Sequence, residues 1–219
     1  MQNNSNASKE KIHNYWEKEY ECTTTQFDVD EPDEWIAKLE MSGKIYGNVL
    51  DAGCGPGRTA MFLADLGYNV LGVDISDNAI KRAKLKAEQK GCTAQFLQSD
   101  MCELSGYDNH FDTVIDIGCF HSLIKSDRNK YAAALHRLCR EEAVIFLRAF
   151  SDMNMKKIIT PGEHVPFLNE EQIRTAFTSN GWIVKNLVQK EIDLLVAQNE
   201  VRMNIYVWYA EIYLDKKTI

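Results

Sequence analysis

Three glycines stand close together at positions 53, 55 and 57, in the segment VLDAGCGPGR that covers residues 49–58. A glycine has no β-carbon, so a ligand can lie directly against the backbone of such a turn and bind its N–H groups. Asp51 comes just before the turn, where its carboxylate could hold a cationic amino group. A glycine-rich turn between a strand and a helix is where open parallel sheets bind ligands. The segment predicts a binding site containing Asp51, Gly53, Cys54, Gly55 and Gly57.

Two further aspartates end or follow predicted strands. Asp74 ends NVLGVD, twenty-one positions after Gly53, close to the spacing at which an acidic residue reaches both hydroxyls of a ribose. Asp100 follows AQFLQ and could accept a hydrogen bond from an adenine amino group, with Ile75 and Met101 on either side of the ring. Because parallel strands end at one edge of a sheet, the three aspartates predict an adenosine-shaped site.

A dinucleotide-binding dehydrogenase is the main competing interpretation, and its fingerprint is GxGxxG. Here the third glycine comes one residue early, and Arg58 stands where that fingerprint has its last glycine. A pyrophosphate would also face Asp51 across a desolvated turn, which sets two anions against each other. A ligand with a cationic amino group fits better. The alternative without a ligand is that these residues only form a tight turn and cap the strands.

The pattern of the chain from Ile45 onward indicates which elements position these residues. Short β-branched runs alternate with helical patterns, which predicts an α/β fold: a doubly wound, Rossmann-like sheet between two helical layers. The predicted strands are Asn48–Asp51, Asn69–Asp74, Ala94–Gln98, Thr113–Ile117 and Ala143–Leu147. The predicted helices between them are Thr59–Leu66, Asn78–Gln89 and Lys130–Arg140. Beyond Ser151 we expect a loop, a helix over Glu170–Ser179 and an antiparallel hairpin of Ile183–Leu195 with Arg202–Tyr213.

Length and composition limit the function. A chain of 219 residues, 45% hydrophobic, predicts one domain, with a helical cover (1–43), a ligand-binding core (44–152) and a lid loop, helix and hairpin (153–219). With 25 Lys and Arg against 32 Asp and Glu, the net charge of −7 disfavours nucleic acid as a partner. The six cysteines form no CxxC pair, and no stretch resembles a signal peptide or a membrane span, so we expect a cytoplasmic protein without a membrane partner.

The segments 49–57, 70–75, 95–101 and 111–117 resemble the successive motifs of class I S-adenosylmethionine-dependent methyltransferases. The resemblance implies a sheet of about seven strands with the last strand antiparallel, and transfer of a methyl group from S-adenosylmethionine to an acceptor. The residues it places around the cofactor are Asp51, Gly53 and Gly55 at the methionine part, Asp74 at the ribose, Asp100 and Met101 at the adenine, and Ile117 and Gly118 beside the sulfonium.

The segment DIGCFHSL, residues 116–123, follows the fourth predicted strand and should face the methyl group. It lacks the (D/N)PP(Y/F) tetrad of adenine- and glutamine-methylating enzymes and is more similar to small-molecule members, such as thiol, thiopurine and tellurite-resistance methyltransferases. His121 is the candidate general base, or it helps to cap the next helix instead. Asp116 either orients His121 or stays in the sheet, and Cys119 is a small buried residue. No HExxH or Cys/His spacing predicts a metal.

Aromatic residues outside the alternating core predict the acceptor pocket. A helix predicted over Ser8–Glu21 gathers several near one face, and thiol and thiopurine methyltransferases have a tryptophan before the first strand. Core packing is the alternative for each. The predicted pocket residues are Tyr15, Trp16, Tyr20, Trp35, His164 and Phe167.

Three functions remain after this comparison. The first is methyl transfer to oxygen, sulfur or nitrogen of a small molecule, achieved by alignment with or without His121 as base. The second is methylation of a protein or RNA, with the net charge arguing against RNA. The third is a module that binds S-adenosylmethionine without turnover.

Overall fold

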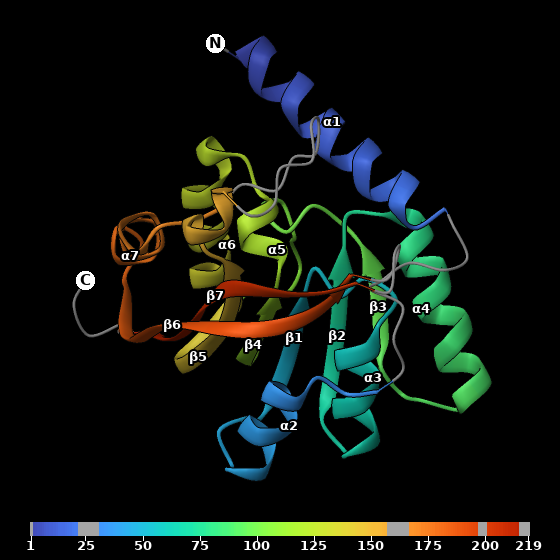
Figure 1. Ribbon diagram of the computed structural model, residues 1–219. Helices are drawn as coiled ribbons and strands as arrows, with labels where there is room; N and C mark the ends of the chain where they lie inside the picture. Colours follow the sequence, from blue (N-terminus) through green and yellow to red (C-terminus); the bar gives the residue numbers. More distant parts are fainter. Residues whose placement is uncertain (1, 22–30, 157–166, 197–200, 215–219) are drawn as a thin grey trace.

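The computed structural model describes residues 2–21, 31–156, 167–196 and 201–214 (Figure 1). The strands are β1 (Asn48–Ala52), β2 (Asn69–Asp74), β3 (Gln95–Gln98), β4 (Phe111–Ile117), β5 (Cys139–Phe150), β6 (Trp182–Val196) and β7 (Val201–Leu214). The helices are α1 (Gln2–Glu19), α2 (Glu34–Met41), α3 (Arg58–Asp65), α4 (Asp77–Lys90), α5 (Cys119–Ser122), α6 (Arg128–Leu138) and α7 (Glu170–Thr178), with 3₁₀ turns η1 (Lys125–Asp127) and η2 (Asp152–Lys156).

The seven strands form one sheet in the order β3-β2-β1-β4-β5-β7-β6. Strands β1 to β5 pair in parallel, whereas β7 is antiparallel to both β5 and β6. The predicted mostly parallel sheet with an antiparallel C-terminal hairpin is therefore confirmed. The chain reverses its winding direction between β1 and β4, and open α/β sheets bind their ligands beyond the strand ends at such a point.

Helices cover both faces of the sheet because neighbouring strand residues point to opposite sides. In β1, Val49 packs with α2, α3 and α4, whereas Leu50 packs with α5, α6 and α7. Both side chains are fully buried, which is why the parallel strands are continuous apolar runs. The two packed faces hold the carboxyl ends of the strands at a fixed edge.

Two differences from the predicted elements have local physical causes. Helix α2 was not predicted from its eight residues; Asp33 caps it by accepting a hydrogen bond from the Trp35 N–H. Helix α6 ends at Leu138 rather than Arg140, because Cys139 already pairs with Phe111 in the sheet.

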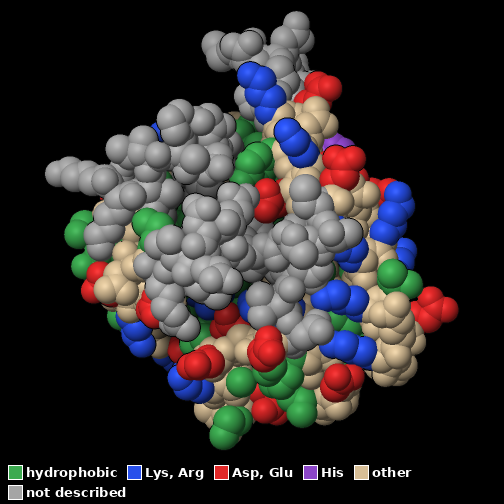
Figure 2. Space-filling model, turned by 45° about the vertical axis from the view of Figure 1, so that its right-hand side comes forward, with side chains coloured by type: hydrophobic (Ala, Val, Ile, Leu, Met, Phe, Trp, Pro, Cys, Tyr) green, Lys and Arg blue, Asp and Glu red, His purple; other side chains and the backbone are tan. Residues whose placement is uncertain are grey.

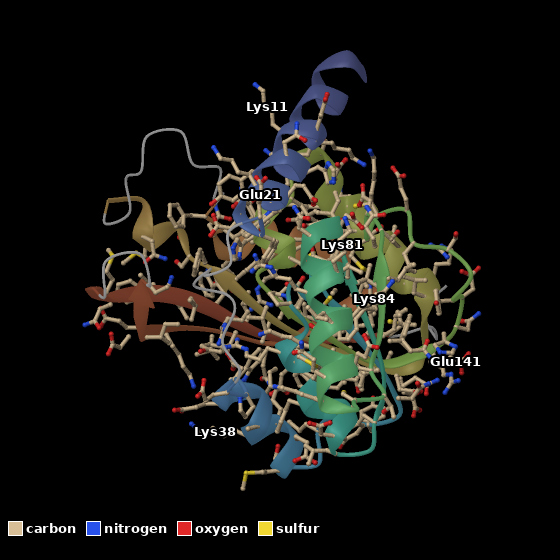
Figure 3. All side chains as sticks on the ribbon, turned by 90° about the vertical axis from the view of Figure 1, so that its right-hand side faces the viewer. Lys11, Glu21, Lys38, Lys81, Lys84 and Glu141 are labelled. Carbon is tan, nitrogen blue, oxygen red and sulfur yellow. The ribbon has the colours of Figure 1, made fainter. Side chains whose placement is uncertain are left out.

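Helix α1 crosses the carboxyl edge of the sheet, from above α5 and α6 to the start of α4 (Figure 1). Viewed from the α4 side, Lys11 projects from α1 into solvent, and Glu21 at the end of this segment lies above Lys81 of α4 (Figure 3). Among the described residues no helix has the length and apolar character needed to cross a membrane.

Candidate active site

The glycine-rich turn joins β1 to α3 at the carboxyl edge of the sheet. Gly53, Gly55 and Gly57 have φ angles of 72°, 52° and 86°, which L side chains rarely adopt. A β-carbon on Gly53 would lie 2.7 Å from Cβ of Cys119, and one on Gly57 would lie 2.7 Å from the Phe96 ring. The turn is thus packed between the β4–α5 junction and β3, and only glycine fits at these two positions.

Asp51 lies in β1 and is 3% exposed. Its Oδ2 accepts a hydrogen bond from the Ala60 N–H of α3 at 3.0 Å, and no described residue donates to its Oδ1. Burial raises the pKa of Asp51 to about 7, although the Ala60 hydrogen bond and the Arg58 charge oppose the change. One oxygen of a buried carboxylate is therefore left for a ligand.

Asp74 ties the glycine turn to the end of β2. Its Oδ2 accepts from the Gly55 N–H at 2.8 Å and its Oδ1 accepts from the Ser76 N–H at 2.9 Å. Burial raises the pKa of Asp74 against these backbone hydrogen bonds. Each carboxylate oxygen has a second lone pair, so both can still accept a hydrogen bond from a hydroxyl group.

Asp100 follows β3 and is already engaged. Its Oδ1 accepts from the Cys102 N–H at 2.8 Å, and its Oδ2 lies 2.9 Å from Nζ of Lys9 in α1. The Ser99 N–H donates to the Asp74 carbonyl at 2.9 Å, which holds the two acidic strand ends together. Sequence reasoning gave no indication of the lysine.

The acidic side chains converge on one region. Burial raises the pKa of the Cys119 thiol well above its ordinary value, and the charges of Asp116, Asp74 and Asp100 add to the effect. Asp51 and Asp74 act in the same way on Cys54. The aspartates predicted to share a site therefore lie close enough to influence the same groups.

The remaining predicted cofactor residues lie at the same edge. Met101 is 4% exposed and belongs to the core beneath α5, α6 and α7. Ile75 and Ile117 are half-buried. Gly118 has φ of 103° and donates its N–H to the Arg148 carbonyl at 3.1 Å, which fixes the end of β4.

Asp116 caps α5 and makes no hydrogen bond to His121. It is fully buried, and it accepts from the N–H groups of Cys119 and Phe120 and from the Tyr131 hydroxyl at 2.6 Å. Burial raises its pKa to about 6, opposed by these hydrogen bonds. Of the two predicted alternatives, the structure supports the one in which Asp116 stays with the sheet.

His121 is 7% exposed and stacks on Phe150, with ring centroids 4.6 Å apart. Its Nδ1 accepts a hydrogen bond from the Phe150 N–H at 3.2 Å, so the neutral ring carries its proton on Nε2. Burial, together with the positive charges of Arg148 and Arg128, lowers the pKa of His121 to about 3. The ring is therefore a neutral donor through Nε2 near neutral pH.

Helix α1 is attached at both ends of the site. Lys9 pairs with Asp100 and lies 3.5 Å from Asp127, while the Glu17 carboxylate accepts from the Ser76 hydroxyl at 2.7 Å. Tyr20 is 6% exposed, and its hydroxyl lies 2.9 Å from where a Gly55 β-carbon would be. The helix therefore covers the glycine turn and the acidic strand ends. Lys9 and Glu17 were not predicted as site residues, because their positions in the sequence do not indicate which distant side chain each one contacts.

The aromatic residues predicted to form the acceptor pocket do not all lie in one place. Tyr15, Trp16 and Tyr20 lie in contact along α1, with Trp16 and Tyr20 stacked at 6.0 Å. The Phe167 ring lies 6.4 Å from Phe150, on which His121 stacks.

Trp35 packs edge-on against Phe146 and Tyr209 between α2 and the sheet. These contacts fit the core-packing alternative, and a role of Trp35 in the acceptor pocket stays a prediction. His164 lies outside the described residues. The described part of the chain contains no cluster of His, Cys, Asp and Glu that could hold a metal ion.

The fold and the acidic, glycine-lined edge define a protein that binds a nucleoside. The model of a methyltransferase domain matches residues 49–142. An uncharacterized methyltransferase of Schizosaccharomyces pombe is 49% identical over 119 residues, which are 54% of this chain and 82% of that protein. The chain belongs to the S-adenosylmethionine-dependent methyltransferase family, and the predicted enzyme class and cofactor are confirmed.

Other similar proteins differ in what their names say they act on. A 2-heptyl-1-hydroxyquinolin-4(1H)-one methyltransferase of Mycobacteroides abscessus is 39% identical over 50% of this chain and 48% of its own length. A tRNA 5-carboxymethoxyuridine methyltransferase of Escherichia coli is 32% identical over 47% of this chain and 40% of its own length. A structure described as conversion of a disulfide bond into a thioacetal group during echinomycin biosynthesis has a TM-score of 0.81 at 30% identity, covering 93% of this chain and 92% of that one.

The residues present fit the family's cofactor. Asp51, Asp74 and Asp116 are at most 7% exposed, and none forms an ion pair with a described Lys or Arg. Burying such charges without a counterion is unfavourable, which is why their pKa values are raised. A ligand carrying an ammonium and a sulfonium group would supply the missing positive charge.

Proposed function

We propose that this enzyme methylates oxygen, sulfur or nitrogen of a small-molecule acceptor. The observation that carries the proposal is the cover formed by α1, which is held over the strand ends by Lys9, Glu17 and Tyr20. An acceptor has to fit beneath this cover, which favours a small molecule over a folded RNA or protein.

Two further observations support a small acceptor. The Mycobacteroides relative is named for a hydroxyquinolinone, and the echinomycin structure for sulfur chemistry on a natural product. Acidic and basic side chains alternate along α1, whereas Lys and Arg are the more frequent charged residues over α4 (Figure 2).

The cofactor supplies an electrophilic methyl group, and we assign the chain's residues to holding it. Asp51, whose Oδ1 receives no hydrogen bond from a described residue, would hold the ammonium group, and the Asp74 carboxylate would accept from the ribose hydroxyls. Oδ2 of Asp100 has a lone pair left for the adenine amino group beside Lys9. Gly53 and Gly55 allow close approach to the backbone.

Catalysis then rests on alignment of the acceptor and exclusion of water, which can contribute about 7 to 11 kcal/mol to lowering a barrier. The aromatic group of His121, Phe150 and Phe167 forms an apolar wall beside Gly118. With Nδ1 occupied, His121 serves as a hydrogen-bond donor to the acceptor rather than as its base.

The test measures S-adenosylhomocysteine release with thiols, phenols, hydroxyquinolones, carboxylic acids and amines, beside bulk tRNA and unfolded protein. We expect turnover with at least one small-molecule class and none with tRNA or protein, and a raised KM for S-adenosylmethionine in Asp74→Ala. Methylation of tRNA or protein alone would contradict the small-molecule acceptor. Tight cofactor binding without turnover on any acceptor would favour a binding module.

A further inference from the structure

Arg128, the first residue of α6, is a buried cation for which the described part of the chain supplies no ion-pair partner. It is 6% exposed, and its Nε and Nη1 atoms are inaccessible and form no hydrogen bond. Within the described ranges no carboxylate forms an ion pair with it. Burying an unpaired charge is costly, and native proteins rarely do so without a functional reason. Two other arginines near the site, Arg58 and Arg148, share the Asp33 carboxylate.

The carboxylate next to Arg128 in the sequence does not neutralise it. Asp127 is 2% exposed, and its oxygens lie 2.9 Å from Nζ of Lys130 and 3.5 Å from Nζ of Lys9. Two lysines thus compensate Asp127, while the guanidinium beside it stays unpaired.

Arg128 lies next to the acidic edge of the site. The carboxylate of its neighbour Asp127 lies 3.5 Å from Nζ of Lys9, which also pairs with Asp100. Burial and the charges of Arg148 and Arg128 also lower the pKa of His121, in the segment that follows β4. Arg148 is compensated by Asp33 at 2.7 Å, whereas none of the described carboxylates pairs with Arg128.

We propose that Arg128 binds an anionic group of the methyl acceptor, so that the substrate is a small organic anion such as a carboxylate, phenolate or thiolate. The inference rests on the proposed function and specifies its substrate class. His121 supplies a second donor to the same group. An anionic acceptor donates a lone pair to the methyl carbon. The bond between this carbon and the sulfonium sulfur breaks, and its electron pair stays on sulfur. No proton has to be removed from the acceptor. This explains how the site works with a histidine that is already protonated on Nε2.

The first test uses the ligand-free protein and needs no known substrate. Arg128→Met replaces an unpaired buried charge by an apolar side chain of similar length, and we expect its thermal unfolding temperature to equal or exceed that of the natural protein. Arg137→Gln, in the exposed part of the same helix, is the control. A large loss of stability in Arg128→Met, with stability retained in Arg128→Lys, would mean that the positive charge at this position is a structural support, and would overturn the proposal.

The second test measures ligand binding by calorimetry. The protein saturated with S-adenosylhomocysteine is titrated with benzoate, salicylate and 2-mercaptobenzoate, and with the methyl ester of each. We expect the natural protein to prefer at least one anion over its ester, and Arg128→Met to lose about ten- to a hundredfold of that preference, the range for hydrogen bonds to a charged group. Equal binding of every acid and ester by the natural protein would overturn the proposal.

Titration with S-adenosylhomocysteine distinguishes a failure of the Arg128 proposal from a failure of the proposed methyl transfer. We expect Arg128→Met to bind it as the natural protein does. A loss of this affinity, with the preference for anions unchanged, would assign Arg128 to the cofactor's own carboxylate and overturn the proposal. A natural protein that binds anions through Arg128 but releases no S-adenosylhomocysteine with any acceptor would contradict the proposed turnover instead.

Discussion

Cofactor affinity should depend on pH through Asp51. Burial moves the pKa of this carboxyl from its ordinary value of 3.8 to about 7 in the ligand-free protein. At about 1.4 kcal/mol for each pH unit, ionising Asp51 in this environment costs roughly 4 kcal/mol more than in water. Because the folded protein holds this proton more tightly than the unfolded chain, the Asp51 contribution to stability falls as the pH rises from about 4 to about 7.

A cationic ligand binds the ionised form, so binding should release the proton. At pH 6 only about a tenth of the ligand-free molecules have Asp51 ionised, and at pH 5 about a hundredth. We therefore expect the dissociation constant of S-adenosylhomocysteine to rise almost tenfold for each unit below pH 7. Asp116, with a pKa of about 6, adds to the slope mainly below pH 6, and His121, with a pKa of about 3, adds nothing in this range.

Isothermal titration calorimetry at pH 5 to 8, in buffers of different ionisation enthalpy, measures both the affinity and the protons released. At pH 6 we expect about one proton released from Asp51 and up to about half a proton from Asp116. Asp51→Asn should bind more weakly at pH 7 and lose most of the slope between pH 6 and 7, whereas Asp65→Asn, an exposed carboxylate at the end of α3, should keep it. A natural protein with constant affinity from pH 5 to 8, or an Asp51→Asn variant with the full slope, would refute the reasoning.

Three further predictions concern the other parts of the site. Asp74→Ala removes the acceptor for two hydroxyls and should cost about 1.5 to 3 kcal/mol of cofactor binding by calorimetry, and unchanged affinity would place the ribose elsewhere. His121→Gln should leave the pH profile of kcat unchanged between pH 6 and 9, and the loss of an ionisation near pH 6.5 would identify a general base. Lys9→Met should change the free energy of unfolding by about 1 kcal/mol or less, because the Lys9–Asp100 ion pair is partly exposed. The same substitution should speed tryptic cleavage of α1 in the ligand-free protein. Equal cleavage rates in the variant and the natural protein would show that Lys9 does not hold the helix.

Much of the cofactor site could be predicted because its signals are local. The glycine turn needs backbone angles that glycine adopts, and the aspartates at 51, 74 and 100 lie at or just after the ends of strands that are recognisable as apolar runs. The number of strands and the reversed last strand came from the resemblance, and the order of the strands was not predicted. Helix α2 was too short to give a periodic signal, and the end of α6 was decided by pairing of Cys139 with Phe111.

The amino-acid sequence by itself determined the parallel strands, the glycine turn and the aspartates at the strand ends, because each is recognised from residues adjacent in the chain. Only the tertiary structure decided what surrounds them. Lys9 reaches Asp100 across 91 positions, and the proton of His121 is placed by the Phe150 N–H, 29 positions away. Whether Arg128 is paired or alone likewise depends on which carboxylates the fold brings near it. Charge compensation and tautomer are properties of contacts between distant segments, and no local pattern of residues encodes them.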